Sequence, residues 1–113
     1  HPAHVDAEYC KKHPFQRIVV PGALTLGVID GLVVKDVISQ RYKVAHYGYD
    51  KIRFLAPVFP GDTISMTAEV KDKRIRNDEF GIILFEYNVK NQKGETVVVV
   101  QDLQMIERKP KVG

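Results

Sequence analysis

A histidine and the predicted start of a helix lie close together in the first part of this chain. His4 belongs to a short run rich in proline and histidine, and Pro21-Gly22 opens an apolar segment soon afterwards. A neutral imidazole can take up a proton near pH 7, and free N–H groups at a helix start can hold a developing negative charge. These groups predict half of an active site, and we expect the other half upstream of residue 1.

Two helices are expected to position these groups. The first covers residues 5–13, with Asp6 as its N-cap. The second begins after Pro21-Gly22 and covers residues 23–39. Its apolar positions recur about one turn apart and are Leu24, Val28, Leu32 and Val33.

Two glycines one turn apart lie within the longer helix, at Gly27 and Gly31. Glycine in a helix interior costs about 1 kcal/mol relative to alanine. We therefore expect the backbone of a sheet to press against this glycine face.

The rest of the chain has the pattern of β-strands. Strands are predicted over residues 49–55, 63–70, 80–89 and 95–106, with turns at 57–62 and 91–94. In the second strand the apolar side chains alternate and share one face: Ile64, Met66, Ala68 and Val70. The valine run 97–100 indicates burial on both faces. The pattern predicts an α+β fold, with a curved antiparallel sheet wrapped around the long helix in a single domain over 1–113.

Composition excludes several classes of protein. The chain is 44% hydrophobic and 27% charged, with a formal net charge of +3 spread among both signs, so we expect no nucleic-acid partner. No apolar run approaches the ~20 residues that cross a bilayer, and the first residues lack the apolar core of a signal peptide. The lone Cys10 cannot form an internal disulfide and favours a reducing, cytoplasmic setting. The four histidines lack metal-ligand spacing, so no metal site is predicted.

Two stretches of the chain resemble a known family. The first stretch comprises Pro2-x-His4-x-Asp6, then Phe15-x-x-x-Ile18, then Gly22-x-Leu24. The second is the run RFLAPVFPGDT over residues 53–63. Together they resemble the MaoC-like dehydratase group of hot-dog-fold proteins, which includes the (R)-specific enoyl-CoA hydratases. The resemblance implies a hot-dog domain that lacks its N-terminal strand and helical segment here.

The resemblance also implies a reaction, the reversible addition of water to a 2-enoyl-CoA thioester. In the family pattern Asp-x-Asn-Pro-x-His, the catalytic histidine falls on His4, and the aspartate falls two positions before His1. His1 stands where asparagine is usual and is expected to bind substrate, together with the amides of Gly22 and Ala23. Pro21 replaces a histidine of the family pattern, so one polar contact is lost.

The family also implies the partners of the chain. Coenzyme A enters as part of the acyl-CoA substrate, and no separate cofactor is expected. Two sheets are expected to join edge to edge in a homodimer or a higher homo-oligomer, with acyl tunnels near the interface. Long exposed edge strands independently favour such pairing.

Other interpretations of the same residues stay open. A hot-dog thioesterase would cleave the thioester with a carboxylate on the helix such as Asp30, and a non-catalytic subunit would only bind acyl-CoA. Asp6 is expected to cap a helix, and Cys10 to be a packed small residue without a basic partner. A basic cluster indicates either a solvated hairpin tip or a site for coenzyme A phosphates; its members are Lys71, Lys73, Arg74 and Arg76.

Overall fold

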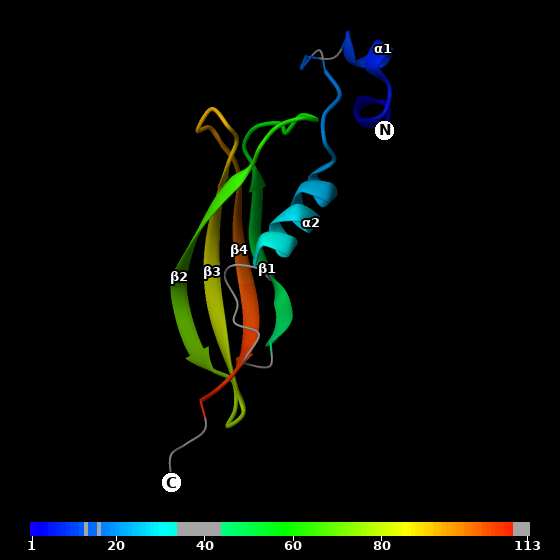
Figure 1. Cartoon of the computed structure of the whole chain (residues 1–113). Helices are drawn as coiled ribbons and strands as arrows, with labels where there is room; N and C mark the ends of the chain where they lie inside the picture. The colour runs from blue at the N-terminus through cyan, green and yellow to red at the C-terminus, as the bar shows by residue number, and fades with distance from the viewer. Residues whose placement is uncertain (13, 16, 34–43, 110–113) are drawn as a thin grey trace.

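A four-stranded antiparallel sheet forms the body of the protein in the computed structural model (Figure 1). The structure describes residues 1–12, 14–15, 17–33 and 44–109. The strands are β1 (Val44–Phe54), β2 (Ser65–Ile75), β3 (Phe80–Lys90) and β4 (Thr96–Glu107), and their order in the sheet is β1-β4-β3-β2. All four predicted strands are confirmed, and β1 and β2 are longer than the sequence indicated.

The two central strands carry most of the core because hydrogen-bonded neighbours cover both of their edges. Val97, Val98 and Val100 are completely buried, and Val99 is half-buried. The predicted two-sided burial of this run is therefore largely confirmed. On β3 the burial alternates, with Phe85, Tyr87 and Val89 turned inward.

Helix α2 (Gly22–Leu32) lies beside the sheet and supplies the other half of the core (Figure 1). Ile29 and Val33 are buried against the inward side chains of β3 and β4. The helix begins one residue earlier than predicted. The predicted part beyond Val33 lies outside the described residues.

The prediction that Gly27 and Gly31 touch the sheet is wrong. A Cβ atom added at either position would meet no atom of the described residues within 4 Å. Leu24 and Val28, on the same side of the helix, are 58% and 46% exposed. The buried side instead contains Thr25, Ile29 and Val33. Apolar residues lie on nearly every side of this helix, so periodicity alone did not identify the side that packs.

Strand β2 corrects the prediction for its inward face. Ile64 and Met66 pack against the core as expected, but Ala68 and Val70 are exposed. β2 is an edge strand, and its register shifts between Val70 and Asp72. Among the described residues, the core cluster along this edge includes Ile64 and Met66 but ends before Ala68, although the alternating apolar pattern continues to Val70.

The basic cluster lies mostly on the edge strand and not at a hairpin tip. Lys71, Lys73 and Arg74 are exposed residues within β2. The chain reverses after Arg76. There the Asn77 side chain accepts hydrogen bonds from Glu79 N and Phe80 N. The hairpin-tip prediction therefore holds only for Arg76.

A buried polar cluster lies on the inward face of the sheet. Asp102 is completely buried, and its Oδ2 accepts hydrogen bonds from Tyr87 Oη (2.8 Å) and Gln104 Nε2 (2.7 Å). His46 Nε2 lies 2.8 Å from Oδ1, and Oδ1 has no hydrogen-bond partner among the described residues. Burial, followed by the bond to Asp102, raises the pKa of Tyr87 far above its usual range, so this phenol remains a donor.

The N-terminal segment projects beyond one end of the sheet (Figure 1). It contains the 3-10 helix η1 (Pro2–His4) and the helix α1 (Ala7–Cys10). The Asp6 side chain accepts from two backbone N–H groups of α1, which confirms its predicted capping role. Cys10 is completely buried, as a packed residue should be. The protomer is elongated as a result, with extents of 66 × 26 × 20 Å. No helix in the described part of the chain is both long and apolar enough to span a membrane.

Candidate active site

An open cavity of about 510 Å³ lies where the N-terminus of α2 faces the end of β1 and the turn that follows it. His4 from the N-terminal segment and Gly22 and Thr25 from the helix line it. Much of the remaining lining is apolar and includes Val20, Phe54 and Val58. The structure therefore brings together the two groups that the sequence singled out, His4 and the start of the helix.

The backbone fixes the orientation of the His4 imidazole. His4 Nδ1 lies 2.6 Å from the carbonyl oxygen of Val19. A carbonyl oxygen only accepts, so this hydrogen bond places the proton on Nδ1. In the neutral ring Nε2 is then unprotonated and can act as a base.

Two backbone hydrogen bonds hold the segment that carries this histidine. Val19 N donates to Ala3 O (3.0 Å), and Val20 N donates to Val58 O (2.7 Å). The extended residues 18–20 therefore tie η1 to the turn after β1. Because both contacts are made by main-chain atoms, the placement of His4 depends little on the side chains of that segment.

His1 lies outside this cavity. Its Nδ1 accepts from Ala3 N (3.2 Å), which caps the first turn of η1, and the residue is exposed. Its expected role in substrate binding stays a prediction, and the structure shows it as the N-cap of the short helix that contains His4.

The start of α2 offers unpaired backbone donors. Leu24 N and Thr25 N both donate to Pro21 O, at 3.0 and 3.2 Å. The N–H groups of Gly22 and Ala23 have no hydrogen-bond partner among the described residues. Gly22 lines the cavity, whereas the Ala23 side chain is exposed. Unpaired N–H groups at a helix start favour an anion or a polarised oxygen.

Gly22 also has a steric reason to be glycine. A Cβ atom at this position would lie 2.8 to 3.2 Å from three ring carbons of Phe54. The ring therefore packs directly on the helix backbone beside the unpaired N–H groups. The close contact on the helix backbone therefore lies at Gly22 and is made by a side chain of β1, whereas the sequence predicted a sheet backbone at Gly27 and Gly31.

Thr25 is a cavity residue that sequence reasoning missed. It is only 3% exposed, it lines the same cavity, and its hydroxyl has no hydrogen-bond partner within the described part of the chain. Its position three residues after Gly22, on the same side of a helix, was the available signal.

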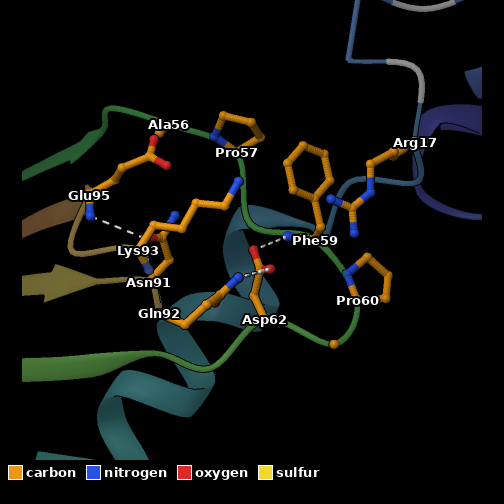
Figure 2. Close-up of a pocket in the computed structure, with 11 residues that line it drawn as sticks. Arg17, Ala56, Pro57, Phe59, Pro60, Asp62, Asn91, Gln92, Lys93 and Glu95 are labelled. Carbon is orange, nitrogen blue, oxygen red and sulfur yellow. Dashed lines mark hydrogen bonds between the residues drawn. The ribbon is translucent and has the colours of Figure 1, made fainter.

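A second cavity of about 300 Å³ adjoins the first, and Ala56 and Pro57 line both. Figure 2 shows Arg17 beside the Phe59 ring, with its Cζ 4.2 Å from the ring centroid. This cavity is more polar than the first, and the Lys93 side chain lines its opposite side (Figure 2).

Asp62 holds the wall of the second cavity together (Figure 2). Its carboxylate accepts from Phe59 N (2.9 Å) and Gln92 Nε2 (3.0 Å), joining the turn after β1 to the β3–β4 hairpin. The hydrogen bond from Phe59 N, followed by that from Gln92, lowers the pKa of Asp62 below its usual range. Gly61 completes the turn with φ of 90°, which glycine adopts without strain.

Asp30 does not approach either cavity. Its Oδ1 accepts from Tyr49 Oη (2.7 Å) on the exposed side of the helix. Burial, followed by this hydrogen bond, raises the pKa of Tyr49 well above its usual range. No group of three potential metal ligands occurs among the residues that the structure describes.

Comparison with known proteins adds a family and related structures. The family model described as the MaoC like domain matches residues 1–102. The chain is 30% identical over 90 residues to the uncharacterized protein YdeM of Bacillus subtilis, covering 80% of this chain and 64% of that protein. It is 33% identical over 75 residues to Protein MaoC of Klebsiella aerogenes, covering 66% of this chain and 22% of that protein.

Solved structures agree with this match. A monoamine oxidase regulatory protein from Archaeoglobus fulgius superposes with a TM-score of 0.89 at 33% identity, over 97% of this chain and 74% of that one. The (R)-hydratase from A. caviae involved in PHA biosynthesis superposes with a TM-score of 0.76 at 23% identity, over 92% of this chain and 74% of that one. The second likeness is evidence for the fold alone.

Proposed function

The chain belongs to the MaoC-like domain family and has the hot-dog fold, and from this premise we propose that it adds water reversibly to a 2-enoyl-CoA thioester. The observation that carries the proposal is one cavity that combines the His4 imidazole, the start of α2 and an apolar wall. Hydration of an enoyl thioester needs a base for water, donors for the thioester oxygen and an apolar space for the acyl chain.

In this mechanism His4 and the acidic residue that the family pattern places two positions before His1 together bind a water molecule. Nε2 of His4 then takes a proton from this water. The water oxygen bonds to C3 of the acyl chain as the C2–C3 double bond opens. Negative charge moves onto the thioester oxygen, and the proton that was taken from the water is then delivered to C2. Dehydration is the same sequence reversed.

The helix start stabilises the charge that develops on the thioester oxygen. Gly22 lines the cavity and its N–H group is unpaired among the described residues, so it is available to donate to the thioester oxygen. One such donor contributes about 2.7 to 4 kcal/mol to the transition state. General acid–base catalysis by His4 is expected to contribute about 10² to 10⁴-fold.

The two adjoining cavities suit the two parts of an acyl-CoA. The more apolar cavity takes the acyl chain, and the more polar one, with Arg17 and Lys93 in its lining, takes part of the coenzyme A arm. Coenzyme A is then part of the substrate, and no separate cofactor is proposed.

A homodimer, acting in the cytoplasm, is part of the same proposal. The protomer is elongated, and large apolar side chains of α2 and β1 are exposed, among them Leu24, Val28 and Phe54. A second copy packed along the helix would cover them. Both cavities would then lie close to the interface.

The experiment follows the ultraviolet absorbance of the enoyl thioester when the protein is mixed with crotonyl-CoA. We expect the band to disappear with the wild type and to persist with His4→Gln, which keeps a similar size but cannot take up the proton. Thermal unfolding shows whether the variant is folded.

Two other outcomes would replace the proposal. Release of free thiol from crotonyl-CoA would indicate a thioesterase. Binding of crotonyl-CoA without loss of the band or release of thiol would indicate a non-catalytic acyl-CoA-binding subunit.

A further inference from the structure

Thr25 is a buried residue of α2 that lines the same cavity as His4 and Gly22. We propose that its hydroxyl binds the thioester carbonyl oxygen of the substrate, as a further donor beside the N–H groups of Gly22 and Ala23. This inference rests on the proposed function and adds to it a side chain that the family pattern quoted above does not contain.

The hydroxyl has no other use within the described part of the protein. Thr25 is only 3% exposed, and it lines the cavity that His4 also lines. A threonine in a helix commonly donates to the carbonyl four residues earlier. Here that carbonyl, Pro21 O, already accepts from Leu24 N and Thr25 N, and the hydroxyl makes no hydrogen bond to it.

Helix geometry directs the side chain toward the correct end of the site. Each Cα–Cβ bond of a helix tilts toward the N-terminus, so the side chain of Thr25 covers the turn that begins at Gly22. Gly22 has no side chain of its own to intervene. The Thr25 side chain and the unpaired N–H groups therefore approach the same end of the cavity.

The surroundings make this donor effective. Much of the cavity wall is apolar, with Val20, Phe54 and Val58 among its residues. A hydrogen bond in such surroundings is stronger than in water. Threonine and valine have nearly the same shape, but only threonine offers a hydroxyl donor. This hydroxyl can rotate to follow the thioester oxygen as charge develops on it.

The test compares Thr25→Val with Thr25→Ser in crotonyl-CoA hydration by the full chain. Removal of the hydroxyl is expected to lower kcat by about 10- to 100-fold with a small change in KM, since the contact strengthens in the transition state. Serine should restore most of the rate. Thr67→Val, on the exposed edge strand β2, is the matched control and should behave as the wild type does.

A second readout reports the contact itself. Infrared difference spectra of bound butyryl-CoA, labelled with ¹³C at the carbonyl, measure how strongly the carbonyl is polarised. We expect the stretching frequency to be higher in Thr25→Val than in the wild type, and serine to restore it. Equal frequencies and equal rates in Thr25→Val and the wild type would overturn the inference.

The two readouts separate this inference from the proposed function. If the wild type binds butyryl-CoA but does not hydrate crotonyl-CoA, hydration is wrong and the infrared shift alone decides the role of Thr25. If the wild type and Thr25→Val hydrate crotonyl-CoA equally and show equal carbonyl frequencies, the proposed function stands and the role of Thr25 falls. If butyryl-CoA does not bind and crotonyl-CoA is not hydrated, both are wrong.

Discussion

His4 Nδ1 and the carbonyl oxygen of Val19 lie 2.6 Å apart, although fifteen positions separate the two residues in the sequence. The contact fixes which imidazole nitrogen carries the proton and which one can accept one. Histidine bases are often oriented by a carboxylate. Here a main-chain oxygen fixes the tautomer.

Replacement of His4 should remove the chemistry and leave the fold. His4→Gln is expected to lower the rate of crotonyl-CoA hydration by about 10² to 10⁴-fold, because the amide cannot act as a base. His4 is half-buried and projects from the N-terminal segment, so the unfolding midpoint should change little. A variant that hydrates at the wild-type rate would exclude His4 as the base.

Gly22→Ala should impair the site more than it impairs stability. The new methyl group would lie within 2.8 to 3.2 Å of the Phe54 ring, but this residue is 53% exposed and its ring can move. We expect a displaced ring to narrow the cavity and to lower kcat/KM, with a small change in the free energy of unfolding. Restoration of activity by adding Phe54→Leu would identify the ring as the cause.

Gly27→Ala, on the same helix, should increase stability. The added methyl group meets nothing within 4 Å, and alanine favours the helix by about 1 kcal/mol over glycine. Chemical denaturation should show a gain of up to that amount. A loss of stability that depends on protein concentration would instead show that a second copy packs against this side.

Tyr87→Phe should destabilise the sheet. It removes one of the two hydrogen bonds to the completely buried Asp102 carboxylate, and a buried polar group without its partner costs about 1 to 3 kcal/mol. Tyr47→Phe is a matched control, because its hydroxyl bonds to Arg76 on the exposed surface. Urea unfolding should separate the two variants, and equal effects would contradict the assigned role of Asp102.

Asp62 should make stability depend on pH in the acid range. Its pKa is lowered in the folded protein, first by the Phe59 N–H group, relative to about 3.9 in an unfolded chain. The contribution is therefore fully present above pH ~4 and is lost as the pH falls through the lower folded pKa. The difference in unfolding free energy between wild type and Asp62→Asn should shrink below pH ~4. A constant difference would show that the carboxylate charge contributes nothing.

Local patterns predicted the strands and turns because their information lies in neighbouring residues. Alternation and valine content marked β3 and β4, and the Pro-Gly-Asp sequence marked the turn that Asp62 closes. The capping role of Asp6 was also predictable, since the contact spans only three residues. The orientation of α2 was not, because the helix is apolar on most sides.

The sequence by itself determined which groups are available: an imidazole, a glycine at a helix start, and strands long enough to form a sheet. Only the tertiary structure decided which of them meet. Val19 O orients His4, Phe54 packs on Gly22, and Thr25 turns into their cavity. The physical reason is that each relationship joins separate elements or depends on the rotation of a helix about its axis. Packing of the whole chain fixes these features, and local periodicity leaves them open.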